Sequence, residues 1–330
     1  MPEYDKRKII RVGEKSWAIT LPRKWCSELG IKPGDVVDLI YYGSSITLKP
    51  MLKAEEQGTR DKGMQLMLDI SRSRDYLMRE LIACYIEGVT RVRIKGNEAD
   101  VSKLINYLQR KLVGLVAVNE ISSSFTDVIF TDISINVNSI LRRMVSLIKV
   151  LLTNLYELID GVRDDVYQSI MSIEDEIDRL YFLGLRVCKN LCTKLSGEEL
   201  LNSIDAISIL KDIENIADSL LRCAEVLRNL RKPHINSAVK ILNYIEKVVM
   251  DTLQSCSENA IEKALNILAS NNELRESIKK VSSRDPSLNT LVNEALLILS
   301  LCRDMAEVTI GKCIRNKACR CKHFYPRLKA

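Results

Sequence analysis

The sequence is poor in the residues that most enzymes need. Only two histidines occur, His234 and His323, and no Ser/His/Asp or Cys/His grouping emerges from the spacing. A glycine-rich loop of the kind that holds phosphates is also missing. Metal-bound carboxylates are the one remaining route to catalysis, and no pattern indicates a substrate pocket. The sequence therefore predicts a protein that is not an enzyme.

Long uncharged apolar stretches are missing as well. None approaches the roughly eighteen residues of a membrane-spanning helix, and Met1–Asp5 does not resemble a signal peptide. The chain has 10 cysteines, but no two have CxxC spacing, and several lie among apolar residues at helical spacing: Cys84, Cys188, Cys223 and Cys302. These features predict a cytoplasmic protein without membrane insertion, whose thiols are reduced and buried.

The net charge of +6 is concentrated at the C-terminal end. Residues 311–330 contain no acidic residue, and their basic residues are Lys312, Arg315, Lys317, Arg320, Lys322, Arg327 and Lys329. Such a tail can bind phosphates or anionic head groups, or it can simply keep a frayed end soluble. Zinc-ligand types lie in the same stretch, but their spacing matches no usual finger or ribbon: Cys313, Cys319, Cys321 and His323.

The first fifty residues alternate short apolar stretches with turn residues. Their order predicts two strands, a short helix framed by Pro22 and Gly30, and a hairpin around Gly43-Ser44. Four short strands carry too little apolar surface to bury a core in one chain. We therefore expect an intertwined homodimer, in which two copies of residues 7–50 share strands.

Four motifs stand out in this segment: Ile19-Thr20-Leu21-Pro22, Glu28-Leu29-Gly30-Ile31, Pro33-Gly34-Asp35 and Ile46-Thr47-Leu48-Lys49-Pro50. Through them residues 6–52 resemble the SpoVT/AbrB-type swapped-hairpin domains, the fold shared by AbrB regulators and MazE antitoxins. The resemblance implies a β-barrel made by two chains, which presents basic side chains to DNA. The positions that match are Arg11, Lys15, Arg23 and Lys24. The chain departs from AbrB-type members at Cys26 and Ser27, where they place a pair of arginines.

The residues that follow Pro50 have a different character. Residues 53–63 are polar and charged and predict a linker. Beyond them we expect a helix over 64–87, a strand over 89–94, a helix over 100–112, and strands over 115–121 and 125–131. This small α/β unit has no nucleophile, glycine-rich loop or ligand cluster, so its predicted role is packing or dimerisation.

From residue 133 onward the apolar pattern is helical and it repeats. Residues 135–141 are echoed by residues 234–239, and each segment opens a long amphipathic stretch. Breaks at 160–161, 196–197, 232–233, 255–257 and 282–286 predict six helices, or two units of three. Long helices with short connections pack as antiparallel neighbours in a bundle.

The first helical unit carries two pairs of carboxylates, each pair one turn apart on a helix: Glu174, Asp178, Glu214 and Asp218. If the pairs face each other, their mutual repulsion should recruit a divalent cation. If they lie on a solvated face, they form ion pairs with neighbours, such as Asp175 with Arg179. The second unit has Arg303 and Glu307 at the positions of Glu214 and Asp218, so we expect no second cluster.

The acidic pairs and the segment Leu210-Lys211-Asp212-Ile213-Glu214-Asn215-Ile216-Ala217-Asp218 resemble the PhoU family over about residues 135–316. Members are two pseudo-repeated three-helix bundles whose E/DxxxD motifs can hold iron or zinc. The resemblance implies an iron or zinc site at the four carboxylates. It also implies control of phosphate uptake through contacts with a transporter ATPase or a signalling protein.

These observations predict an α+β multidomain protein that is mainly helical. The predicted order is a swapped-hairpin barrel (1–53), a linker (54–63), a small α/β domain (64–132), a PhoU-like bundle of two three-helix repeats (133–316) and a basic tail (317–330). The expected function is a DNA-binding regulator of phosphate uptake. The alternative is an adaptor that docks on transporter or signalling proteins and uses its barrel only for dimerisation.

Overall fold

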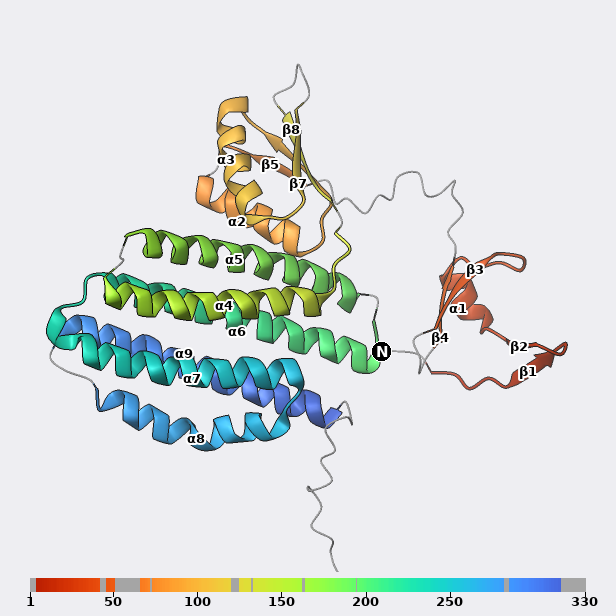
Figure 1. The fold of residues 1–330 in the computed structure, drawn as a ribbon. Helices are drawn as coiled ribbons and strands as arrows, with labels where there is room; N and C mark the ends of the chain where they lie inside the picture. The colour runs from red at the N-terminus through yellow and green to blue at the C-terminus, as the bar shows by residue number, and fades with distance from the viewer. Residues whose placement is uncertain are drawn as a thin grey trace, which may run out of the picture. The chain divides into compact units, whose positions relative to one another are not determined.

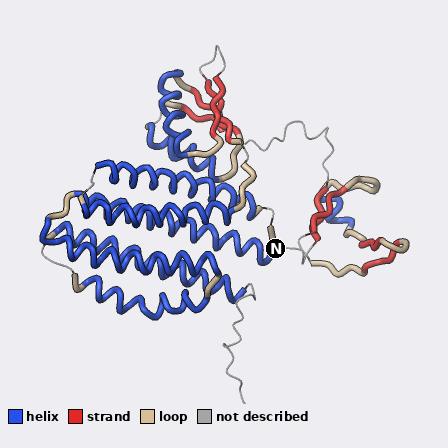
Figure 2. The backbone as a smooth tube through the Cα atoms, in the orientation of Figure 1, coloured by secondary structure: helices blue, strands red, loops and turns tan. Residues whose placement is uncertain are grey.

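The structure is a computed structural model, which describes residues 4–41, 46–50, 66–71, 73–119, 125–131, 133–161, 164–193, 195–281 and 285–315. The chain divides into two compact units, Met1–Lys62 and Gly63–Ala330. Figure 1 shows their elements in order along the chain, and Figure 2 shows that helices dominate the second unit. The predicted linker lies outside the described residues, as do residues 316–330.

The first unit contains two separate hairpins around one short helix. Its elements are β1 (Ile9–Val12), β2 (Ser16–Ile19), α1 (Arg23–Glu28), β3 (Val37–Tyr41) and β4 (Ile46–Pro50). Strands β1 and β2 pair antiparallel, as do β3 and β4, and each pair is a two-stranded sheet by itself. Gly30 takes a φ of 69°, the left-handed value that ends α1. The predicted order of elements is therefore confirmed, while the turn at Gly43-Ser44 lies outside the described residues.

The second unit begins with a four-stranded sheet and two helices. The elements are β5 (Leu66–Asp69), α2 (Arg74–Ile86), β6 (Arg91–Lys95), α3 (Glu98–Lys111), β7 (Leu115–Asn119) and β8 (Phe125–Phe130). The strand order is β5-β6-β8-β7, in which β5 and β6 run parallel and the other pairs run antiparallel. Side chains from the sheet and both helices form a core of their own, which includes Leu77, Tyr85 and Phe130.

The prediction of one helix over 64–87 is wrong in its first part. Residues 66–69 form β5, and helix α2 begins only at Arg74. Leu66 and Leu68 pair with Val92 and Ile94 of β6, and the backbone N–H of Ser71 donates to Asp69 Oδ1 at 2.9 Å to start the turn. Pairing with a strand more than twenty residues away overrides the local helical pattern.

Six long helices follow, as predicted. They are α4 (Val137–Asp160), α5 (Asp164–Cys192), α6 (Gly197–Arg228), α7 (Ile235–Glu258), α8 (Ile261–Lys279) and α9 (Pro286–Arg315). Helices α6 and α9 pack against each other where the two predicted repeats meet, and a single apolar core runs through both repeats. Figure 1 shows the helices side by side, with α8 on the edge farthest from the sheet.

One helix break lies later than expected. Helix α7 continues through Ser255 and Ser257 to Glu258, and the chain turns at Asn259, whose φ is 51°. The hydroxyl of Ser255 is buried and donates to the carbonyl of Ala260 at 3.2 Å. Serine is therefore tolerated in this last turn because its hydroxyl finds a backbone acceptor.

The sheet domain packs against the bundle through helix α5. Arg186 of α5 is buried and donates to the backbone oxygens of Tyr85 and Val89 at 2.7 and 3.1 Å. Its guanidinium also lies 5.0 Å from the centre of the Tyr85 ring. No helix in the described part of the chain is both long and apolar enough to cross a membrane.

Candidate functional site

The four residues predicted to contact DNA lie in β1, its turn and the start of α1. Arg11 stands in β1, and its Nε donates to the carbonyl oxygen of Gly13 at 3.2 Å. Gly13 has a φ of 71°, so the turn that carries Lys15 uses a left-handed glycine. Arg23 and Lys24 form the first turn of α1, directly after Pro22. All four side chains belong to exposed residues, so they are available to an anionic partner.

The first unit exposes its apolar side chains as well. Trp17 is 74% exposed, Ile9 is 62% exposed and Leu39 is 67% exposed. No described residue of this unit is buried. A folded chain does not stay stable with its only apolar side chains in water, so this unit needs a second surface to cover them.

The predicted carboxylates lie where α5 and α6 pack together. Ile177 of α5 and Ile213, Ile216 and Ala217 of α6 are buried in the bundle core. Gly184 lets the two helices come close, because a Cβ at this position would lie 2.7 Å from Cδ1 of Leu210. Three carboxylates of the same two helices converge: one oxygen each from Glu174, Asp178 and Asp218 lies within 4.8 Å of the others.

An ammonium group from another domain reaches the same place. Lys111, the last residue of α3, has its Nζ 2.6 Å from Asp175 Oδ1 and 2.9 Å from Asp178 Oδ2. The side chains of Lys111 and Asp178 are only 17% and 19% exposed, so water screens this pair weakly. Asp175 thus bonds a lysine of the sheet domain, where the sequence suggested an intrahelical pair with Arg179.

The fourth predicted carboxylate does not join the group. Glu214 Oε2 lies 2.7 Å from the Nζ of Lys211, three residues earlier on the same helix. The Lys211 ammonium also lies 5.0 Å from the centre of the Tyr181 ring on α5. Lys211 therefore holds Glu214, and the structure brings together three of the four predicted ligands.

Burial and like charge shift the proton affinity of this cluster. The pKa of Glu174 is raised to about 7, first because the carboxyl is partly removed from water and then because Asp178 lies beside it. Lys111 opposes this rise. Burial by itself lowers the pKa of Lys111, but the hydrogen bonds to Asp175 and Asp178 together outweigh burial, so the net shift of its pKa is upward. Burial also raises the pKa of Glu214. Within the group, Glu174 therefore keeps a proton at a higher pH than an ordinary glutamate does, and the Lys111 ammonium lies beside Asp178.

The donor set of this cluster fits a divalent ion. Three carboxylate oxygens from two helices suit a hard cation, which prefers oxygen ligands. Zinc usually takes nitrogen or sulphur ligands, and no histidine or cysteine belongs to the group. Glu174, Asp178 and Asp218 would hold such an ion, and Lys111 would have to give up its bond to Asp178.

Sequence reasoning missed both lysines. Lys111 is 67 residues from Asp178 and belongs to another domain, so no spacing rule connects the two. Lys211 precedes Glu214 by three residues on the same helix, and this spacing alone could have predicted an ion pair between them. At the C-terminal end, the thiol of Cys313 is buried and donates to the carbonyl of Asn259 at 3.1 Å. Its three companions in the suggested zinc set lie outside the described residues.

Two family models match separate parts of the chain. Residues 141–227 match the family model of the PhoU domain, which covers α5 and most of α4 and α6. Residues 10–56 match the model of the antidote-toxin recognition protein MazE, a bacterial antitoxin. No curated protein matched the chain. The two family matches confirm that this chain joins a MazE-type segment of the swapped-hairpin class to a PhoU domain.

Proposed function

We propose that the protein is a cytoplasmic, dimeric regulator of phosphate uptake that binds DNA through its first unit. The observation that carries this proposal is the combination of a MazE-type segment and a PhoU domain in one chain. Both families are regulatory and non-enzymatic. The PhoU match supports the phosphate part of the proposal, and the exposed basic side chains of the first unit support the DNA part.

The exposed apolar side chains support the dimer. Ile9 pairs with Ile19 and Arg11 pairs with Trp17, so one face of β1 and β2 carries these three apolar side chains together with Arg11. Ile10 and Val12 lie on the opposite face, and both are more than half exposed, at 51% and 54%. Both faces of this hairpin therefore carry exposed apolar side chains, which a second chain can cover.

The basic side chains then determine how tightly DNA is held. Four contacts from each chain would neutralise up to about eight phosphates, and log affinity should fall with log salt at a slope of about −7. The double variant Arg23→Ala/Lys24→Ala removes half of these contacts, so its slope should be about −3.6. Filter binding or fluorescence anisotropy with mixed genomic fragments measures both values.

The matched control is Lys240→Ala/Lys280→Ala, which removes two exposed lysines beside the ends of bundle helices. It should leave the affinity and the slope unchanged. Equal slopes for the wild type and the α1 double variant would contradict DNA binding through this surface. That result would favour the adaptor that docks on transporter or signalling proteins.

The acidic cluster is the second part of the proposal. Glu174, Asp178 and Asp218 bind a divalent ion such as Mn²⁺ or Fe²⁺, and this ion is the signal or the structural support that the bundle receives. What supports this step is the closeness of three carboxylates from two helices and the raised pKa of Glu174. Elemental analysis of the native protein tests it, and an absence of stoichiometric metal would contradict it.

A further inference from the structure

A cavity in the bundle is lined by basic side chains and by no acidic one. It has a volume of about 500 Å³ and lies where α4, α6, α7 and α9 meet. Arg142 and Lys149 come from α4, and Lys312 comes from α9. All its lining residues belong to the described part of the chain, and none of them is Asp or Glu.

The cavity is built from both repeats. Arg142, Ser146 and Lys149 follow one another along one face of α4, at spacings of four and three residues. Arg142 and Lys149 are thus two turns apart, about 10 Å along the helix axis. Lys312 approaches from the last helix of the second repeat, and Ser257 adds a hydroxyl from the end of α7.

The three cations have little to neutralise them. Arg142 donates to Ser139 Oγ at 3.1 Å, which is a neutral acceptor. Within the described residues, Lys149 and Lys312 form no ion pair. Arg142 and Lys149 are exposed and Lys312 is half-buried, so all three heads can reach a ligand in the cavity. Positive charges that face one cleft without acidic partners attract anions to it.

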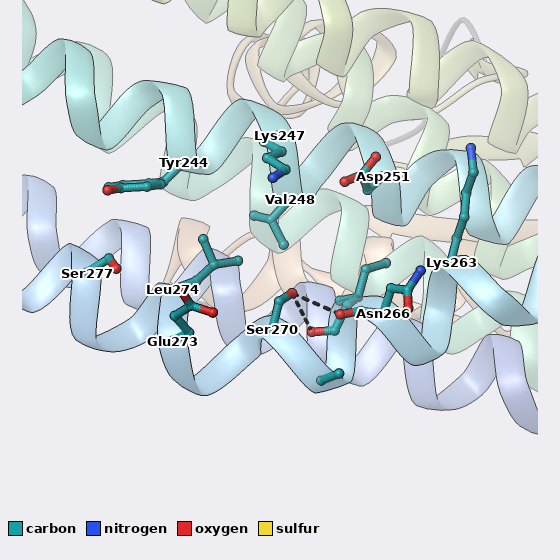
Figure 3. A pocket seen from close by; sticks show the side chains of 12 residues that line it. Tyr244, Lys247, Val248, Asp251, Lys263, Asn266, Ser270, Glu273, Leu274 and Ser277 are labelled. Carbon is teal, nitrogen blue, oxygen red and sulfur yellow. Dashed lines mark hydrogen bonds between the residues drawn. The ribbon is translucent and has the colours of Figure 1, made fainter.

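A larger cavity in the same bundle has a lining whose charges balance, and it serves as a comparison. The cleft between α7 and α8 has a volume of about 810 Å³ and is lined by Lys247, Lys263, Asp251 and Glu273 among others. Figure 3 shows Lys247 and Asp251 on one wall, and Glu273 with Asn266 on the other. Its two positive and two negative side chains balance, so it does not favour anions.

The basic cavity also continues into a neighbouring one. A second cavity of about 640 Å³ shares Asn138, Leu141, Ile209, Asn259 and Lys312 with it. Apart from Lys312, the lining of this second cavity is uncharged, and it is made of amides, hydroxyls and apolar side chains. Lys312 therefore stands at the junction between a basic cavity and an uncharged one.

We propose that this pair of cavities binds a phosphorylated small molecule. Arg142, Lys149 and Lys312 hold its phosphate group, and its uncharged part lies in the neighbouring cavity. Because α4 and α9 belong to different repeats, the ligand bridges the two halves of the bundle. The proposal depends neither on DNA binding by the first unit nor on a metal at the acidic cluster.

Titration calorimetry of the full-length dimer tests this site with three probes: inorganic phosphate, pyrophosphate and ribose 5-phosphate. We expect ribose 5-phosphate to bind more tightly than inorganic phosphate, because only the former can use the neighbouring cavity. The variant Lys149→Gln should weaken binding about tenfold, or about 1.4 kcal/mol. Lys149→Gln/Lys312→Gln should weaken it about a hundredfold. Neither lysine has an ion pair to lose, so both variants should melt like the wild type.

The matched control is Lys247→Gln in the balanced cleft, and it should bind every probe as the wild type does. The proposal is overturned if no probe binds the wild type at millimolar concentration, or if Lys247→Gln weakens binding as much as Lys149→Gln. Inorganic phosphate bound as tightly as ribose 5-phosphate would overturn the role of the neighbouring cavity.

Discussion

The two units of this chain differ in how far they bury their side chains. In Met1–Lys62, the apolar Ile10 and Trp17 are 51% and 74% exposed, and no described residue is buried. In Gly63–Ala330, Ile148 and Leu210 are fully buried, and the charged Asp127 is only 4% exposed because two arginines bind it. The first unit leaves its apolar side chains exposed, whereas the second unit buries its apolar side chains and pairs its buried carboxylate within one chain.

This difference shows which sites one chain can reveal. A unit that cannot cover its own apolar side chains needs a second molecule to cover them, so the proposed DNA-binding surface depends on the proposed dimer. The second unit has its own cores, and its acidic cluster and basic cavity are complete in a single chain.

The largest effect should follow from placing charged side chains on the hairpin of β1 and β2. The double variant Ile10→Asp/Ile19→Asp places carboxylates on both faces of β1 and β2. Each lost apolar burial costs about 1.5–3 kcal/mol, and the added charges cost more. We expect complete loss of the dimer at micromolar concentration in sedimentation velocity, while the helical signal of the bundle stays.

The control for this variant is Val150→Asp on α4, where Val150 is already 48% exposed in the second unit. It should remain a dimer. A wild-type protein that sediments as a folded monomer would contradict dimerisation through the first unit, and so would a double variant that remains a dimer.

A smaller effect is expected at the buried ion pair of the sheet. Asp127 of β8 accepts bonds from Arg93 Nε at 2.8 Å and from Arg91, both on β6. Asp127 is buried but the two arginines are partly exposed, so Asp127→Asn removes charge-assisted hydrogen bonds and should destabilise the sheet by about 2 kcal/mol. Hydrogen exchange of the β6 and β8 amides measures this loss. Asp100→Asn on α3, whose side chain is 55% exposed, should change it by less than about 0.5 kcal/mol.

The same pair predicts a dependence on pH. The bonds from Arg93 lower the pKa of Asp127 from its ordinary 3.8 to about 2. A carboxyl whose pKa is lower in the folded state stabilises the fold above about pH 4, and this stabilisation is lost as the pH falls through about 2. Asp127→Asn should remove this acid-dependent loss. An unchanged acid profile would contradict the role given to the pair.

The smallest expected effect concerns the cation that already occupies the acidic cluster. Lys111→Met removes the ammonium that binds Asp178, so a divalent ion no longer competes with it. We expect Mn²⁺ affinity to rise about tenfold, or about 1.4 kcal/mol. Calorimetry with Mn²⁺ measures it, and Lys103→Met on the exposed side of α3 is the control. Equal affinity in the wild type and the Lys111 variant would mean that Lys111 does not compete for the site.

The helical repeat was readable from the sequence because its apolar residues keep a helical period over long stretches. The hairpins of the first unit were readable because Pro22 and Gly30 frame α1 and because the strands are short and regular. Strand β5 was missed, since Leu66, Met67 and Leu68 are compatible with either structure and only their pairing with β6 decides.

The candidate sites were less predictable than the fold. The closeness of Glu174 and Asp178 follows from their spacing on one helix, but their distance from Asp218 depends on how α5 packs against α6. The bond from Lys111 depends on how a separate domain docks. The basic cavity combines Arg142 and Lys149 of α4 with Lys312 of α9, which comes more than 160 residues later in the chain, and no local pattern brings them together.

Mapping the DNA that crosslinks to the protein in its native cells tests whether the protein binds DNA through its first unit. We expect wild-type protein to enrich discrete genomic sites, including sites beside genes of phosphate uptake. Arg23→Ala/Lys24→Ala should lose this enrichment, while Lys240→Ala/Lys280→Ala should keep it. Wild-type protein that enriches no site above the level of the Arg23→Ala/Lys24→Ala variant would contradict the account.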